Sequence, residues 1–195
     1  ERAVALHRFW PYLAPLCAGL GGVVLLAPFP VVVSPILFCL SGALFLVASW
    51  LVYRQMPAIF TFTLFLGALS LLLGNLVWLL RAEVSVAMPF WMSFLVLTIA
   101  GERLELTRLL PPKPVGRLIF IGLLGFIVLA ACLILFAVPH ATQLLAASWL
   151  ILALWLLRYD IARRTVRQTG LTRFVAVCLL LGYGWLAVGG FLGLV

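Results

Sequence analysis

The sequence has 195 residues, of which 66% are hydrophobic and 9% are charged, and its formal net charge is +8. Soluble globular domains are about 45–50% apolar and about 25% charged, so this composition excludes an ordinary soluble fold. It predicts a chain embedded in lipid, where roughly 20 apolar residues make one transmembrane helix and the whole length allows about seven.

Proline, glycine and charged residues divide the chain into seven apolar segments, and apart from their end residues these segments contain no Asp, Glu, Lys, Arg or His. Each is expected to be helical, because unpaired backbone groups in hydrocarbon cost several kcal/mol apiece. We therefore predict that residues 1–195 form a single all-α domain, a polytopic bundle of seven transmembrane helices. The predicted spans are residues 9–27, 33–53, 58–80, 84–101, 117–138, 141–158 and 173–194.

The basic residues predict how these spans are oriented. With the N-terminus in the cytoplasm, twelve of the 13 basic residues fall on the cytoplasmic side and only Arg81 falls on the other. Because basic residues favour cytoplasmic loops, we predict an N-in, C-out topology. Anionic lipids at that face are expected partners, since they attract each nearby Lys or Arg by about 1 kcal/mol. Nucleic acid is not an expected partner, because the basic residues line one membrane face.

Glycines and one amide are the notable small and polar features within the predicted spans. Asn75 follows Gly74, and Gly67 lies seven residues before Gly74 on the same helical face. Close helix packing at the glycines, with Asn75 bonding a neighbouring helix, is the favoured interpretation; a polar pathway or ligand site is the alternative. In the last span, Gly189 and Gly193 form a GxxxG pair that indicates contact with another helix of this chain or of a partner.

Two charged segments lie on the predicted cytoplasmic side, GERLELTR (101–108) and RYDIARRTVRQTG (158–170). In a helix, Glu102 and Glu105 share a face, and Asp160 reaches Arg163 and Arg164 at positions i+3 and i+4. We interpret the carboxylates as counter-ions within a group of arginines, with a docking surface for a partner or lipid headgroups as the alternative. A catalytic carboxylate pair is disfavoured, because no base, metal ligand or nucleophile accompanies it. The candidate contact surface comprises Glu102, Arg103, Glu105, Arg108, Asp160, Arg163, Arg164 and Arg167.

The histidines and cysteines predict no metal or cofactor site within this segment. His7 and His140 fall on opposite sides of the predicted membrane, so they cannot share a metal. The four cysteines lie in separate spans without CxxC spacing and are interpreted as small buried hydrophobic residues. They are Cys17, Cys39, Cys132 and Cys178.

Four stretches of the sequence resemble an uncharacterised family of bacterial polytopic membrane proteins that is distantly similar to the NnrS-like haem–copper membrane proteins. The stretches are ERAVAL (1–6), FLVLTIAGERLELTRLL (94–110), WLLRYDIARRTVRQTGLTRF (155–174) and GYGWLAVGG (182–190). The resemblance implies a location in a bacterial cytoplasmic (inner) membrane. It also implies further spans on both sides that carry histidine motifs of the HGPLM and GHAP kind. Neither motif occurs here, so haem or copper would be held by regions outside this sequence. The chain starts at Glu1 and ends in FLGLV, and we expect both ends to be cuts in a longer protein.

These observations favour a non-catalytic integral-membrane subunit or scaffold that packs against partner helices in a larger bioenergetic membrane assembly. One alternative is a haem- or copper-associated membrane protein with its ligands outside this segment. Another is a small-molecule transporter with an uncharged pathway through Asn75 and the glycine-rich last span. The lack of ionisable residues inside the predicted spans disfavours a proton-coupled transporter.

Overall fold

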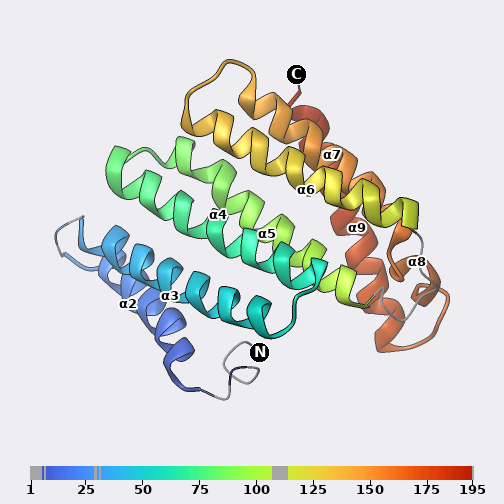
Figure 1. The fold of residues 1–195 in the computed structure, drawn as a ribbon, viewed down its shortest axis with the longest axis horizontal. Helices are drawn as coiled ribbons and strands as arrows, with labels where there is room; N and C mark the ends of the chain where they lie inside the picture. The colour runs from blue at the N-terminus through green and yellow to red at the C-terminus, as the bar shows by residue number, and fades with distance from the viewer. Residues whose placement is uncertain (1–5, 7, 29, 31, 107–113, 195) are drawn as a thin grey trace. The chain divides into compact units, whose positions relative to one another are not determined.

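The computed structural model describes residues 6, 8–28, 30, 32–106 and 114–194, and within these ranges the chain is helical and contains no strands. The prediction of an all-α protein is confirmed. Figure 1 shows the elements, which are η1 (Trp10–Tyr12), α2 (Leu13–Leu26), α3 (Val33–Gln55), α4 (Ile59–Arg81), α5 (Val84–Leu106), α6 (Pro114–Leu135), α7 (Ala141–Tyr159), α8 (Ala162–Thr165) and α9 (Leu171–Leu192).

Six of these helices, α3 to α7 and α9, are long and apolar enough to cross a membrane, which makes the chain an integral membrane protein. The first predicted span, residues 9–27, corresponds to η1 and α2, which together form a shorter apolar helix. Helix α2 alone has 14 residues, or about 21 Å at 1.5 Å per residue. That length is short of the roughly 30 Å of a bilayer's hydrocarbon core, so six helices rather than seven have the length of a span.

The chain forms two compact units, Glu1–Gly101 and Glu102–Val195. In the N-terminal unit, α3 packs against both α2 and α4. Two hydroxyl groups of α3 tie it to the backbone of α2: Ser34 Oγ donates to the Gly21 carbonyl oxygen at 2.8 Å, and Ser41 Oγ donates to that of Ala14 at 2.7 Å. Bonds of this kind between membrane helices contribute about 0.6 kcal/mol on average, so the pair helps to hold a short helix in place.

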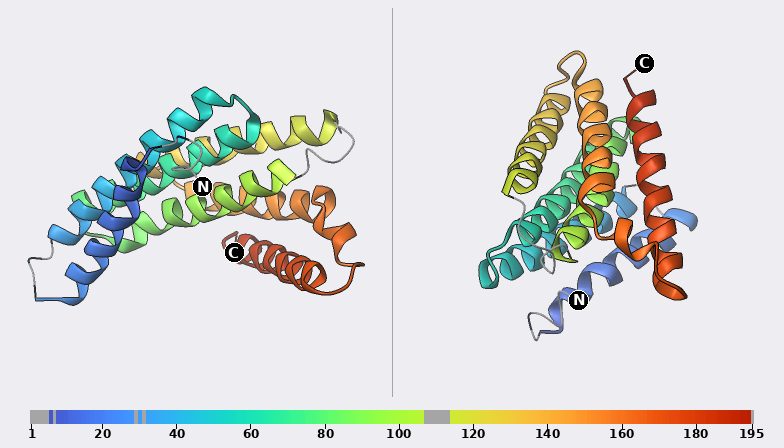
Figure 2. Two further views of the ribbon diagram at one scale, coloured as in Figure 1. Left: turned by 90° about the horizontal axis from the view of Figure 1, so that it is seen from below. Right: turned by 90° about the vertical axis from the view of Figure 1, so that its right-hand side faces the viewer.

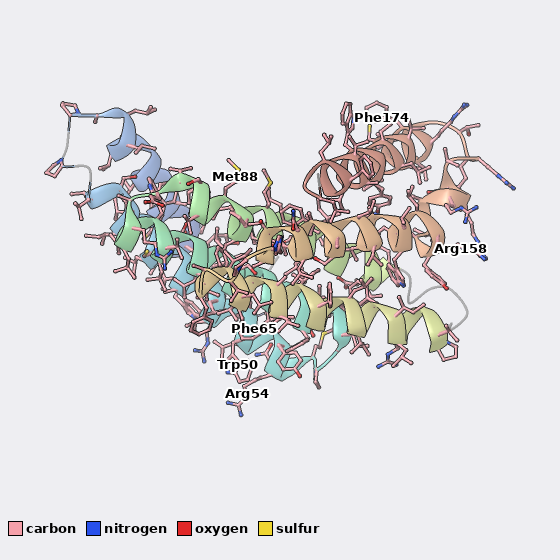
Figure 3. The ribbon with its side chains drawn as sticks, turned by 90° about the horizontal axis from the view of Figure 1, so that it is seen from above. Trp50, Arg54, Phe65, Met88, Arg158 and Phe174 are labelled. Atoms are coloured by element: carbon pink, nitrogen blue, oxygen red, sulfur yellow. The ribbon has the colours of Figure 1, made fainter. Side chains whose placement is uncertain are left out.

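Aromatic rings join the end of α3 to the first turns of α4. Trp50 and Phe65 have ring centroids 5.3 Å apart, and Tyr53 and Phe62 have centroids 5.6 Å apart. Figure 3 shows Trp50 close to Phe65, with the side chain of Arg54 extending away from the unit. Aromatic rings and an arginine beside them are typical of the interface between lipid and water.

In the C-terminal unit, α7 packs against both α6 and α9, and the short α8 packs against α9. Figure 2 shows α9 running beside α7 in both views. Helix α6 is fixed by Trp155 of α7, whose Nε1 donates to the Gly116 carbonyl oxygen at 2.9 Å. A Cβ on Gly116 would lie 2.9 Å from Cε1 of Tyr159, so any larger residue there would have to displace that ring.

Candidate functional site

The first charged segment continues a membrane helix. Helix α5 extends past Gly101 to Leu106, so Glu102 and Glu105 lie on its last turns, where both are exposed and Arg103 is half-buried. Arg108 lies outside the described residues. The helix therefore continues five residues beyond the predicted span 84–101, and both glutamates are available to solvent, lipid headgroups or a partner.

The second charged segment differs from the expectation. Helix α7 ends at Tyr159, Asp160 has an extended backbone (φ −69°, ψ 149°), and α8 starts only at Ala162. The i+3 and i+4 pairing expected for Asp160 needs a continuous helix, and this break removes it. Three arginines of the candidate contact surface in this segment are exposed, as is the neighbouring Arg158, whereas Asp160 is only 4% exposed, so Asp160 is not part of the same surface. The exposed arginines are Arg163, Arg164 and Arg167.

The Asp160 carboxylate instead contacts α9. The hydroxyl group of Tyr183 donates to Asp160 Oδ2 at 2.5 Å, and Tyr183 is itself only 3% exposed. The other carboxylate oxygen, Oδ1, is also buried and has no hydrogen-bond partner among the described residues. Sequence reasoning missed this pair because the two residues are 23 positions apart. The available signal was a tyrosine inside an apolar span, since a buried tyrosine hydroxyl normally has a polar partner.

Asn75 links three helices of the N-terminal unit. Its Nδ2 donates to the Phe38 carbonyl oxygen of α3 at 2.8 Å, and its Oδ1 accepts from Trp91 Nε1 of α5 at 2.9 Å. The side chain is 4% exposed. Both ends of the amide are therefore engaged in helix packing, the arrangement that the packing interpretation requires.

The glycines beside Asn75 lie where α4 meets α5. A Cβ on Gly74 would be 2.6 Å from Cδ1 of Trp91, and one on Gly67 would be 3.3 Å from Oγ1 of Thr98. Gly74 thus leaves the space in which the Trp91 ring reaches Asn75. Gly74 and Asn75 therefore both contribute to the contact of α4 with Trp91.

A family model described as a domain of unknown function, DUF8744, matches residues 1–195. The chain belongs to the DUF8744 family. No curated protein matches it, and no solved structure matches it either. Because the match covers the whole sequence, both helical units belong to the DUF8744 domain.

The predicted GxxxG pair of the DUF8744 chain lies only partly in a helix contact. A Cβ on Gly193 would be 2.8 Å from Cβ of Ala146 on α7, but a Cβ on Gly189 would have no atom within 4 Å. The backbone of α7 instead approaches Gly190, whose Cβ would be 2.8 Å from the backbone nitrogen of Leu150. Of the two glycines, Gly193 therefore lies in a contact within this chain, and contact of Gly189 with a partner helix stays a prediction.

The cysteines and histidines of the DUF8744 chain were predicted to hold no metal. Among the described residues, no group of three or more His, Cys, Asp or Glu side chains could hold a metal ion. His140 is exposed, with its Nδ1 2.6 Å from Oε1 of Gln143, and His7 lies outside the described part of the chain. The prediction that all four cysteines are buried is wrong: Cys132 and Cys178 are exposed on the helix surfaces, and Cys17 and Cys39 are only half-buried.

Proposed function

We propose that this DUF8744 chain is a non-catalytic subunit or scaffold of a larger bioenergetic membrane assembly, in which its helices pack against those of partner proteins. The observation that carries the proposal is the open face of α9. Gly182 and Gly189, seven residues apart and so on one side of the helix, have no atom within 4 Å of a would-be Cβ. Exposed glycines on a membrane helix let a second helix approach closely.

Large apolar side chains flank these glycines within the C-terminal unit. Trp185 is 74% exposed and Phe174 is 65% exposed. Figure 3 shows Phe174 at the outside of α9. Small residues beside large ones form the holes and knobs with which helices interlock, so this face is suited to a partner helix as well as to lipid.

The polar side chains of the N-terminal unit support a packing role. Asn75, Ser34 and Ser41 use their side chains to bond neighbouring helices. A transport pathway through Asn75 would require breaking two of these bonds, so the transporter alternative is less favoured. The haem- or copper-associated alternative rests on the sequence resemblance, and a Soret band or stoichiometric copper in the purified protein would support it.

The proposed topology has seven spans, with the N-terminus and most basic residues in the cytoplasm of a bacterial cell. It requires η1 and α2 to cross the membrane, and without them the six long helices place the N-terminus outside. A reporter fused to the N-terminus therefore distinguishes the two arrangements. We expect the N-terminal reporter to be protected from protease added to intact cells. A second reporter, inserted after Ala82, should be cleaved under the same conditions. Cleavage of both reporters would contradict the seven-span topology.

The proposed subunit role is tested by the state of the protein in native membrane. We expect the chain to be extracted in mild detergent together with a different membrane polypeptide in fixed ratio. Gly189→Leu fills the open face of α9 and should release that partner. Val188→Leu, at the neighbouring exposed position, is the matched control and should retain it. A lone monomer with its own enzymatic turnover would contradict the proposal.

A further inference from the structure

Exposed arginines gather where the C-terminal unit turns from α7 into α9, over residues 158–173, which we call the basic turn. Helices α7 and α9 are each long and apolar enough to span a membrane, so the basic turn between them lies at a membrane surface. Figure 3 shows Arg158 at the α8 end of α7. In the described part of the chain, no guanidinium group of the turn meets a carboxylate or another hydrogen-bond acceptor. The exposed arginines are Arg158 on α7, Arg163 and Arg164 on α8, Arg167 after it, and Arg173 on α9.

The backbone of the basic turn brings three of these arginines together. It stays coiled beyond α8: the Val166 nitrogen donates to the Ala162 carbonyl oxygen at 3.0 Å, and the Arg167 nitrogen donates to that of Arg164 at 3.2 Å. Residues three and four apart on such a coil are neighbours, and like charges at this spacing repel. Arg167 is therefore a neighbour of both Arg163 and Arg164. An anion bound among the three would relieve their repulsion.

The one acidic residue of the basic turn is withdrawn from its surface. Asp160 is 4% exposed, and its Oδ2 accepts a hydrogen bond from the hydroxyl group of Tyr183 on α9. This bond, together with the packing of α8 against α9, holds the turn in place. The exposed side of the turn is therefore fixed to a membrane helix, and residues 158–173 contribute positive charge to it without a neutralising carboxylate.

Large apolar side chains are exposed beside the arginines, on the first turn of α9. Leu171 is 77% exposed and Phe174 is 65% exposed, and Arg173 lies between them in the sequence. Guanidinium groups bind phosphate through paired hydrogen bonds, and apolar side chains at the edge of a membrane contact acyl chains. A phospholipid supplies both groups in one molecule, whereas an acidic protein segment would match the arginines alone.

We propose that the basic turn is a specific binding site for one anionic phospholipid. The phosphate group of the lipid lies among Arg163, Arg164 and Arg167, and its acyl chains lie along the first turns of α9 beside Phe174. Such a site differs from the diffuse attraction of lipid to any basic residue at a membrane surface. Arg54, for example, is exposed at the end of α3 but has no basic neighbour at helical spacing. The site is independent of the subunit role, because a lone chain would hold the lipid equally.

Native mass spectrometry of the purified protein counts the lipids that it holds. The protein, in a mild nonionic detergent, is titrated with phosphatidylglycerol or with phosphatidylcholine, which also has a phosphate group but no net charge. We expect the first phosphatidylglycerol to bind at a concentration about a hundredfold lower than phosphatidylcholine, because three arginines each favour the anionic lipid about fivefold. Equal affinity for the two lipids would overturn the proposal. So would a lack of saturable binding, which is the result expected if the turn docks an acidic protein.

Two variants show whether the basic turn is responsible. Arg164→Gln removes one of the three neighbouring guanidinium groups and should raise the dissociation constant of the first phosphatidylglycerol about fivefold. Arg54→Gln, which removes an exposed arginine from the same predicted membrane face, is the matched control and should leave that constant unchanged. Equal weakening by both variants would indicate diffuse attraction and refute the site. Both side chains are exposed, so the helices should be retained in each variant, which far-UV circular dichroism checks.

Discussion

The closest backbone approach to a glycine in the described helices is at Gly190, where α9 crosses α7. A Cβ there would lie 2.8 Å from the Leu150 nitrogen and 2.9 Å from the Ala146 carbonyl oxygen. These are backbone atoms, which cannot rotate away. Ordinary contacts begin at 3.4 Å, so Gly190→Ala must separate the two helices by about 0.6 Å. Overpacking of this kind typically costs about 1–3 kcal/mol.

Gly189→Ala is the matched control, because the same atoms are added one position earlier in open space. Replacing glycine by alanine within a helix also gains up to about 1 kcal/mol of helix propensity. That gain is common to both variants and cancels in their difference. We therefore expect Gly190→Ala to be less stable than Gly189→Ala by about 1–3 kcal/mol.

Reversible unfolding of the C-terminal unit in mixed micelles, induced by dodecyl sulfate and followed by far-UV circular dichroism, measures this difference. Equal stability of the two variants would refute the account of the α7–α9 contact. A lower stability of Gly189→Ala would show that the sequence motif, and not the contact with Leu150, identifies the packed face.

Three other predictions concern the N-terminal unit and the basic surface. Asn75→Leu removes two interhelical hydrogen bonds and strands the indole N–H of a neighbouring tryptophan; we expect a loss of about 1–3 kcal/mol in the same unfolding assay, and an unchanged free energy would contradict the three-helix link. Gly74→Ala should be more destabilising than Gly67→Ala, because the added methyl group meets an indole ring at 2.6 Å in the first case and a hydroxyl oxygen at 3.3 Å in the second; the reverse order in thermal denaturation would refute this reading of α4 and α5. Arg164→Glu should weaken the thermal stabilisation that anionic lipid gives, whereas Arg81→Glu, at the predicted opposite face, should not; equal effects would argue against the proposed topology.

The sequence predicted the helices well because lipid leaves the backbone little choice. Each apolar segment had to be helical, and charge or proline marked most of the breaks. The predicted span 58–80 and the observed α4 (Ile59–Arg81) differ by one residue at each end. The length of α2 was harder to predict, because Trp10–Tyr12 form the separate 3₁₀ turn η1 although the apolar sequence already begins at Phe9.

Side-chain contacts were predicted only where residue type restricts the partner. The amide of Asn75 in an apolar helix needs a partner on another helix, and the structure supplies two. The pairing of Asp160 with Arg163 and Arg164 was predicted wrongly, because the i+3 and i+4 rule assumed a helix that continues through Asp160. Helix α7 ends at Tyr159, one residue before it. Its true partner, Tyr183, depends on the register between α7 and α9. The same register decides that Gly190, and not Gly189, lies against α7.

The proposed membrane subunit is tested most directly by the mass of the complex that surrounds this chain in native lipid. Membrane patches excised with a styrene–maleic acid polymer and analysed by native mass spectrometry report that mass without detergent. We expect a complex that exceeds the mass of the native protein containing this chain by the mass of at least one different polypeptide, and the loss of that polypeptide in Gly189→Leu. A mass of one chain, or of whole multiples of it, in both proteins would contradict the proposed role.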